Sequence, residues 1–469
     1  MYNGNDLIEM GLRPCKEFDN WIKAANNMHT KKGFSYDEIK DILLQRQPLL
    51  EGMRDTPASF TDYLVDTNEL EWLNKQKVEE AFREVMKQPK VMGGAIMPDG
   101  CPAGEAPVGS VIAVNNALVP SYHSADVCCS VALTELLEDI SPSALLDDIQ
   151  KYSHWGGIPM DEEKRFIEIE EEFLGRLSNN PFTRDLHRKA ARDFGSQGDG
   201  NHFYYVGHRQ SRGRLCIVSD HGSRGFGAEV YRRGLRAAKK YCNGRTSYDP
   251  RGHAWLDFDT DEGRDYWEAL KLVREWTKRN HFDFHNAIIN MHDAHIADSF
   301  WNPHNFIFKK GSTFYHAKGA TPNYAGHSAD DSGLTLVPLN MEEPILILSH
   351  TDNPNTYGFA PHGAGRNMSR TQFLRENPEP RKPLVDYRFW AGRADASELP
   401  DAYKSAEKVR NEIKEFDIGE VVDQINPYGC VMAGDTDYDA PWRVKKREKE
   451  AKRNHKEVGL KKDQGDSDG

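Results

Sequence analysis

The chain has 469 residues, of which 38% are hydrophobic and 29% are charged. This composition is typical of a globular protein with a large core, and it excludes a fibrous or intrinsically disordered chain. The formal net charge of −12 excludes a surface coated with positive charge for nucleic acid, so a polyanionic substrate must meet local arginines or bound cations.

The first 90 residues are predicted to be mostly helical. One helix is predicted over residues 74–88. Val78, Phe82 and Val85 recur there at helical spacing and define a face that must be buried. The next part of the chain contains short aliphatic runs separated by glycine and proline, which predict buried strands. The clearest runs are residues 108–114, 215–219 and 344–348.

Later segments add a second helix and a final apolar stretch. A helix is predicted over residues 265–278, where Trp267 and Leu270 lie at helical spacing. An apolar run over residues 426–434 closes the fold, so periodicity predicts a protein of mixed α and β structure. Beyond it, residues 435–469 are rich in lysine, arginine and glutamate, and we predict a solvated helix or a flexible charged tail.

Side chains that bind metal ions recur beside glycines or turns. Asp126 and Cys129 stand three residues apart, where a carboxylate and a thiolate can share a cation, although cysteine is also often a small buried apolar residue. Other candidates in similar surroundings are Asn201, His202, Asp220, His221, His304, Asn305 and His316. One cysteine, carboxylates and several histidines predict a borderline metal such as manganese, zinc or iron.

The most informative segment is His-Gly-Ala-Gly-Arg-Asn-Met-Ser-Arg, residues 362–370. Its glycines let backbone N–H groups approach a phosphate, and its two arginines supply bidentate donors. His362 is then a nucleophile or proton carrier; the alternative is a structural turn with a hydrogen-bonded histidine. Further candidate phosphate ligands are Arg224 and Lys318. Metal, phosphate and histidine together predict nucleotidyl or phosphoryl transfer, with hydrolysis by a metal-bound water as the alternative.

A second histidine pair, His292 and His295, stands three residues apart on a predicted helix. No glycine loop or anion donor accompanies this pair. We therefore expect a structural role for both residues.

The ordered motifs make the sequence similar to the RtcB family of RNA-splicing ligases, over about residues 97–434. The matching segments are residues 97–99, 107–109, Asp126 with Cys129, residues 198–203, 222–225, 304–305, 318–320, 362–366 and 402–404. Their order is far more specific than any one motif. The resemblance implies one mixed α/β globular catalytic domain over residues 91–434, with central β-sheets flanked by helices. Residues 1–90 would pack on this core as a mostly helical region.

The resemblance also implies roles for individual residues. Two manganese ions would be bound by Asp126, Cys129, His202, Asp220 and His304. His362 would attack the α-phosphate of GTP and carry GMP as a phosphoramidate. The nucleotide would be bound by Asn201, Asn305, Lys318, Asn340, Gly363, Ala364, Gly365, Arg366 and Tyr403. GMP would then pass to an RNA 3′-phosphate, and an RNA 5′-hydroxyl would displace it.

One departure from the family motifs concerns a metal ligand. The family has His-Ser-Gly-Ser-Arg where this chain has Asp-His-Gly-Ser-Arg, so Asp220 occupies the position of a ligand histidine. Carboxylate suits manganese, and strand alternation turns Asp220 and His221 to opposite faces. We favour Asp220 as the ligand, with His221 as the alternative.

Other departures fall where the family binds guanine. Tyr205 replaces an acidic residue, Pro338 to Met341 replace a Pro-Gly-Ser-Met loop, and Ala433 replaces a lysine. Cys101 also replaces a histidine in the first motif. Because a site that hydrogen-bonds a base discriminates strongly, these changes put the preference for GTP in question. We therefore expect a divergent member of the family.

The leading functional hypothesis is a cytoplasmic RNA ligase acting on RNA with broken ends, with an archease-type activator as a candidate partner. The alternatives are a metal-dependent phosphohydrolase or cyclic phosphodiesterase of RNA ends, an end-capping nucleotidyltransferase that does not ligate, and a protein that only binds ends. No membrane partner is expected, because no apolar run reaches the roughly 18 residues that cross a bilayer. Seven cysteines without disulfide-framework spacing fit a reducing compartment.

Overall fold

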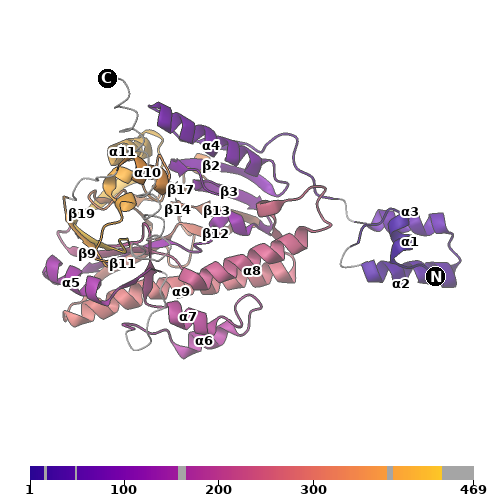
Figure 1. Ribbon diagram of the computed structural model, residues 1–469, viewed down its shortest axis with the longest axis horizontal. Coiled ribbons are helices and arrows are strands. Elements are labelled where there is room, and N and C mark those ends of the chain that lie inside the picture. Colours follow the sequence, from indigo (N-terminus) through magenta and orange to yellow (C-terminus); the bar gives the residue numbers. More distant parts are fainter. Residues whose placement is uncertain (15–17, 48–49, 157–164, 378–383, 436–469) are drawn as a thin grey trace, which may run out of the picture.

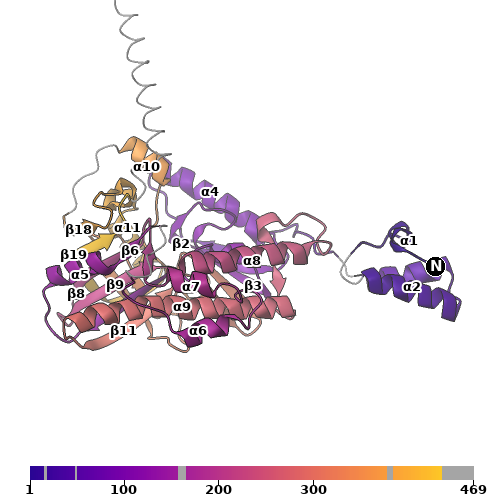
Figure 2. The same ribbon diagram turned by 60° about the horizontal axis from the view of Figure 1, so that its bottom comes forward.

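The computed structural model describes residues 1–14, 18–47, 50–156, 165–377 and 384–435 (Figures 1 and 2). Two β-sheets form the centre of the main body, and helices cover them from outside (Figure 1). The predicted mixed α/β fold with central sheets and flanking helices is confirmed. The predicted charged tail lies outside the described residues, apart from Asp435.

The smaller sheet has five strands, and only the first pair is parallel. In spatial order the strands are β1 (Phe60–Asp62), β2 (Val91–Cys101), β3 (Val108–Asn115), β13 (Thr313–Lys318) and β12 (Asn305–Lys310). Helix α4 (Glu69–Met86) covers this sheet, and its apolar stripe of Val78, Phe82 and Val85 is fully buried. The helix predicted over residues 74–88 is therefore confirmed.

The larger sheet has eight strands. Its strands are, in spatial order, β11 (Ile296–Pro303), β5 (Ser130–Leu136), β9 (Leu215–His221), β8 (Phe203–Arg209), β19 (Glu420–Met432), β16 (Ile345–Ser349) and β15 (Leu334–Val337), and β18 (Asp386–Phe389) pairs with β19. Every residue of β5 and β9 is buried, as expected for strands covered on both faces. The strands predicted over residues 108–114, 215–219 and 344–348 correspond to β3, β9 and β16, and the apolar stretch over residues 426–434 falls on the end of β19.

The long helices α8 (Arg224–Cys242) and α9 (Asp261–Met291) pack against each other on the outside of the main body (Figures 1 and 2). Helix α9 lies against β5 and β9 of the larger sheet, and α5 (Pro142–Tyr152) lies against β8 and β19. Helix α9 is longer than the predicted segment 265–278, because its second half buries the polar residues His281 and His285 against the sheet. The prediction that His292 and His295 lie on a helix is wrong, since α9 ends at Met291 and both follow it.

Shorter elements complete the main body. The helices are α6 (Glu171–Leu177), α7 (His187–Asp193), α10 (Arg370–Glu376) and α11 (Ala406–Glu415). The short strands are β4 (Ala117–Leu118), β6 (His154–Trp155), β7 (Ser196–Gly198), β10 (Leu256–Asp257), β14 (Ala320–Pro322) and β17 (Phe359–Pro361). None of the described helices is both long enough and apolar enough to cross a membrane.

The first three helices form a hydrophobic cluster of their own. They are α1 (Gly4–Glu9), α2 (Phe18–Lys32) and α3 (Tyr36–Arg46), and they lie at one side of the main body (Figure 1). Leu7, Ala25 and Leu43 are fully buried among them. Capping boxes at Asn3 and Ser35 begin α1 and α3. The division of the chain at residues 90 and 434 stays a prediction.

Candidate metal and nucleotide site

A cavity of about 410 Å³ lies where the two sheets approach each other. Strand β11 of the larger sheet ends at Pro303 and β12 of the smaller sheet begins at Asn305, so His304 stands at the passage between them. The residues to which the family resemblance gives a role line this cavity, with the exception of His202; they are Asp126, Cys129, Asn201, Asp220, His304, Asn305, Lys318, Asn340, His362, Gly363, Ala364, Gly365, Arg366 and Tyr403. The fold thus brings residues from eight separate segments to one place. The other candidates, His221, Arg224 and His316, are not among its lining residues.

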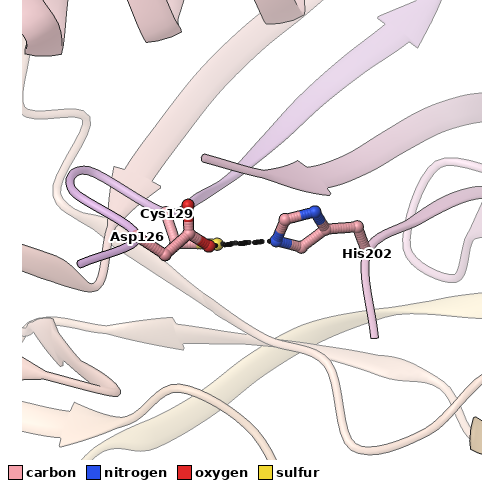
Figure 3. Close-up of side chains that lie close together, drawn as sticks. All are labelled: Asp126, Cys129 and His202. Carbon is pink, nitrogen blue, oxygen red and sulfur yellow. Dashed lines mark hydrogen bonds and ion pairs between the residues drawn. The ribbon is translucent and has the colours of Figure 1, made fainter. Parts of the chain in front are cut away.

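Asp126, Cys129 and His202 form the first group of candidate metal donors (Figure 3). The Nε2 of His202 lies 3.1 Å from Oδ2 of Asp126 and 3.4 Å from Sγ of Cys129. The Nδ1 of His202 donates to the carbonyl oxygen of Gln197 at 2.8 Å, which leaves Nε2 as the ligand atom. Only glycine fits at Gly222, because an added Cβ there would lie 2.0 Å from the Asp126 carboxylate.

Cys129, Asp220 and His304 form the second group, with their ligand atoms within 4.8 Å of one another. The Sγ of Cys129 donates to Oδ1 of Asp220 at 3.3 Å. Neighbouring side chains of a strand point to opposite faces, so His221 turns away from this group. Its ring instead stacks on that of His281, with centroids 3.5 Å apart. Geometry therefore places Asp220, and not His221, among the donors.

The charges of these donors favour a bound cation. Burial raises the pKa of Asp220 to about 6, and burial beside two carboxylates raises the pKa of the Cys129 thiol well above its usual value. Burial also acts on Asp126, but its contact with His202 lowers the pKa of Asp126 to about 2. The Nδ1 of His304 is buried without a hydrogen bond to any described residue. Crowded acidic groups and an unpaired imidazole nitrogen fit one or two divalent ions.

His362 lies beside these donors, at the end of β17, with its ring centroid 5.0 Å from that of His304. Its Nδ1 lies 2.6 Å from Oδ2 of Asp99, a fully buried carboxylate on β2. The same oxygen accepts the backbone N–H groups of His362 and Gly363, at 3.2 and 3.3 Å. Three donors on one oxygen fix the ring with Nδ1–H toward Asp99, so Nε2 carries the lone pair in the neutral ring.

Asp99 also sets the charge of this histidine. Burial lowers the pKa of His362, but the Asp99 carboxylate and its hydrogen bond outweigh burial, so the pKa is raised above its ordinary value. Asp99 lies in one of the matched motifs, but the motif by itself indicates no role for it. The signal that could have indicated one is an acidic residue within a long, buried, mostly apolar strand.

Lys318 supplies positive charge to the cavity lining. Its Nζ donates to the carbonyl oxygen of Ala106 at 2.6 Å, and burial lowers its pKa to about 8. Asn305 lies next to it across the β12–β13 pair, and its side-chain oxygen accepts the backbone N–H of Gly319 at 2.7 Å. Both side chains are therefore held in place before any ligand arrives.

Arg366 belongs to a network that the sequence did not indicate. Its guanidinium pairs with Glu398 and lies over the ring of Tyr403, 4.6 Å from the ring centroid. Arg370 pairs with the other oxygen of Glu398, and the Tyr403 hydroxyl donates to Glu398 at 2.6 Å. Glu398 is only 2% exposed. This buried carboxylate therefore positions both predicted phosphate-binding arginines.

The remaining wall of the cavity is mostly apolar. Its lining includes Phe203, Leu339, Met341 and Met432. The side-chain oxygen of Asn340 accepts the backbone N–H groups of residues 342 and 343, which leaves its amide NH2 as the polar group at this wall. Tyr205, expected near the base because of its place in the motif, is instead buried in the core. Its hydroxyl donates to the carbonyl oxygen of Ile425 at 2.8 Å.

Three other candidate residues contact structural partners. The Nε2 of His316 accepts the backbone N–H of Val119 at 2.9 Å in the core. His292 pairs with Asp148 at 3.0 Å, and His295 pairs with Glu138 at 2.8 Å. These contacts agree with the structural role expected for His292 and His295.

Comparison with known proteins agrees with this arrangement. The family model for tRNA-splicing ligase RtcB matches residues 81–433. The chain is 26% identical to the tRNA-splicing ligase RtcB of Thermococcus kodakarensis, over 52% of this chain and 60% of that protein. It is 25% identical to the tRNA-splicing ligase RtcB of Archaeoglobus fulgidus, over 81% of this chain and 94% of that protein.

Coverage differs among the relatives. The match to the tRNA-splicing ligase RtcB of Methanocaldococcus jannaschii is 23% identical and spans only 35% of that protein. The chain therefore matches about a third to three fifths of the length of some relatives and nearly all of others. The family model nevertheless covers more than half of the 469 residues, in the region that contains the cavity. The chain belongs to the RtcB family.

Proposed function

We propose that this protein is an RNA ligase that joins an RNA 3′-phosphate or 2′,3′-cyclic phosphate end to a 5′-hydroxyl end. The observation that supports it best is the contact between Asp99 and Nδ1 of His362, which leaves Nε2 as a nucleophile beside the metal donors. A protein that only binds RNA ends has no need for a histidine oriented in this way. The names of the relatives, tRNA-splicing and RNA-splicing ligases, support the same activity.

The proposed reaction has three steps. Nε2 of His362 attacks the α-phosphorus of a nucleoside triphosphate, so a P–N bond forms and pyrophosphate leaves. An oxygen of the RNA 3′-phosphate then attacks the same phosphorus, and the P–N bond breaks. Finally the 5′-hydroxyl of a second RNA attacks the activated 3′-phosphate and releases the nucleoside monophosphate. A cyclic phosphate end is first opened by water to a 3′-phosphate.

The residues of the cavity divide this work. Asp99 orients the nucleophile, and Lys318 and Arg366 contact phosphate oxygens. Asn201, Asn305 and the backbone of residues 363–365 complete the nucleotide site. Divalent ions bound by Asp126, Cys129, His202, Asp220 and His304, manganese by similarity to the family, would neutralise charge on the phosphates. GTP is the proposed nucleotide by the same similarity.

Ligation is tested with two RNA oligonucleotides, one ending in 3′-phosphate and the other labelled and starting with 5′-hydroxyl. We expect a joined product with manganese and a nucleoside triphosphate, and none with chelator. The assay is repeated with a first RNA that ends in a 2′,3′-cyclic phosphate, and opening of this end without joining would instead support a phosphodiesterase. Transfer of nucleotide to the 3′-phosphate without joining would support an end-capping enzyme, and neither reaction under any nucleotide would contradict the proposal.

Weak base selectivity is a specific expectation for this chain. The mostly apolar wall of the cavity, where we propose that the base binds, offers Leu339, Met341 and Met432 rather than a set of hydrogen-bonding groups. Sites that hydrogen-bond a substrate reject analogues by about 10⁴-fold or more, whereas apolar pockets discriminate by about 10- to 200-fold. We expect kcat/KM for self-nucleotidylation with GTP and ATP to differ by less than about 200-fold. A ratio above about 10⁴ would show that other groups read the base.

The choice between Asp220 and His221 as ligand can be tested directly. Because Asp220 lies 3.3 Å from Cys129, Asp220→Ala is expected to raise the manganese concentration for half-maximal self-nucleotidylation by about 100-fold or more. His221→Gln keeps a polar side chain and is expected to leave that concentration within about threefold, because its ring packs on His281. The reverse order of effects would identify His221 as the ligand.

The wider setting is proposed from the family and from composition. Archease-type activation is a proposed requirement, tested by adding such a protein to the ligation assay. The cytoplasm is the proposed location, because Cys129 must stay a free thiol to bind metal. The helical region of residues 1–90, the catalytic domain of residues 91–434 and the tail of residues 435–469 are the proposed units of the chain.

A further inference from the structure

A second group of metal-binding side chains lies apart from the cavity. His327 and Asp331 belong to the segment between β14 and β15, and His350 directly follows β16. One ring nitrogen of each histidine and one oxygen of Asp331 lie within 4.8 Å of one another. These three described residues do not line the cavity that contains His362.

The two sites lie at opposite ends of one hairpin. Strands β15 and β16 are antiparallel, and Leu334 pairs with Ser349 at the open end of the hairpin. His350 follows Ser349, so the three side chains gather at that end. The connection at the other end, residues 338–341, lines the cavity. The second group is therefore separate from the proposed manganese centre.

The spacing of the three side chains resembles that of ligands around one ion. The Nδ1 of His327 lies 3.5 Å from Oδ1 of Asp331, and the Nε2 of His350 lies 3.8 Å from the same oxygen. Ligand atoms about 2.1 Å from a tetrahedral zinc ion stand about 3.4 Å apart. Hydrogen bonds between nitrogen and oxygen are shorter, about 2.7 to 3.2 Å. The distances therefore fit shared coordination better than direct hydrogen bonding.

His350 gives an independent indication of a ligand. Its side chain is 8% exposed, and neither ring nitrogen has the geometry of a hydrogen bond to a described residue, although the backbone of Leu334 lies near enough to act on the pKa of the ring. The Oγ of Ser328, beside His327, is also buried without a hydrogen bond among the described residues. Buried polar atoms nearly always have a partner. A metal ion with a bound water would provide partners for these atoms.

The carboxylate of this group is fixed in advance. Asp331 accepts the backbone N–H groups of Gly326 at 2.7 Å and Gly333 at 2.9 Å, one on each oxygen. The preceding residue, Asp330, pairs with Arg274 of α9 at 2.6 Å. These contacts anchor the segment and position the carboxylate oxygens toward the two imidazoles. A site of this rigidity loses little entropy when a metal binds.

The competing explanation is a purely structural one. The Nδ1 of His327 lies 3.2 Å from the carbonyl oxygen of Tyr324, and Nδ1–H would donate to it. In the other tautomer the Nδ1 lone pair faces Asp331 and can bind a metal. The structural explanation accounts for His327 but leaves both nitrogens of His350 without hydrogen bonds.

We propose that His327, Asp331 and His350 bind a divalent transition metal ion of the zinc type. Two imidazoles and one carboxylate are a common zinc-binding set, and they leave a fourth position for water or another ligand. Bound metal would tie the segment before β15 to the end of β16. The proposal does not depend on ligase activity.

The test uses the full chain, freed of metal by chelation, and Zn²⁺ as the probe. The manganese centre is disabled by Cys129→Ser with His304→Ala, so that binding elsewhere can be counted. We expect this protein to bind one equivalent of Zn²⁺, and to show a rise in Tm when Zn²⁺ is added. Adding His350→Ala is expected to remove both effects. Adding His295→Ala is the matched control, because that exposed histidine also pairs with a carboxylate, and both effects should persist.

Two results would overturn the proposal. One is a protein with a disabled manganese centre that binds no Zn²⁺ at micromolar concentration. The other is unchanged binding after His350→Ala. If His350→Ala fails to fold, His350→Gln and Asp331→Asn are compared by circular dichroism and metal content. Folded variants that keep the full equivalent of Zn²⁺ would then refute the site.

Discussion

Replacing His362 with alanine is expected to abolish covalent nucleotide transfer to the protein and, with it, RNA joining. No other described histidine has its Nδ1 held by a buried carboxylate inside the cavity. Loss of a nucleophile of this kind costs about 10⁴- to 10⁶-fold in rate. The measurement is incubation with manganese and each α-³²P-labelled nucleoside triphosphate, followed by denaturing electrophoresis and mass spectrometry of the labelled peptide.

The matched control for this variant is His295→Ala. His295 also contacts a carboxylate, but its side chain is 75% exposed and lies outside the cavity. Labelling of this control should equal that of the unaltered protein. A His362→Ala protein that still folds and still becomes labelled would show that another residue carries the nucleotide. Lys318 would be the first to examine, because it is the one lysine among the described residues that line the cavity, and burial lowers its pKa to about 8.

Asp99→Asn is expected to reduce self-nucleotidylation by about 10²- to 10⁴-fold, because an amide no longer selects the Nδ1–H tautomer of His362. The substitution keeps the size of the side chain. It removes the charge that raises the pKa of His362. Below that pKa the ring is protonated at Nε2 and cannot attack phosphorus. The acid limb of the rate profile should therefore move to lower pH in the variant, while the maximum rate falls.

Asp148→Asn is the control for Asp99→Asn. Asp148 pairs with His292 at 3.0 Å, outside the cavity, so its substitution tests the loss of an aspartate–histidine pair in general. Its pH profile and rate should match those of the unaltered protein. A reduced rate for Asp99→Asn without any shift of the acid limb would assign Asp99 a structural role only.

Local patterns predicted most of the regular structure. The stripe Val78, Phe82 and Val85 predicted α4 because burial of one helical face follows directly from spacing. The same rule underestimated α9, since His281 and His285 are buried yet count as polar. Their nitrogens contact Ser219 of β9, at 2.7 and 2.8 Å, a pairing that no periodicity within the helix could indicate.

The residues that line the cavity were predicted better than the contacts that hold them. Ordered motifs identified Cys129, Asp220 and His362 because each lies in a distinctive local sequence. Asp99 contacts His362, 263 positions away, and Glu398 of a 3-10 turn pairs with Arg366, 32 positions away, so neither contact follows from a local motif. The place expected for Tyr205 was wrong for a related reason, because the alternation of β8 turns its side chain into the core.

The hydrogen bond between His362 and Asp99 joins residues separated by 263 positions, and Tyr403 and Met432 complete the cavity from still later in the chain. Such long-range contacts form late in folding, because loop closure must precede them. No contiguous fragment shorter than the stretch from Asp99 to Met432 contains the whole site. Self-nucleotidylation should therefore report completion of folding, and a nascent chain should remain unlabelled until the strand ending at Met432 has left the ribosome.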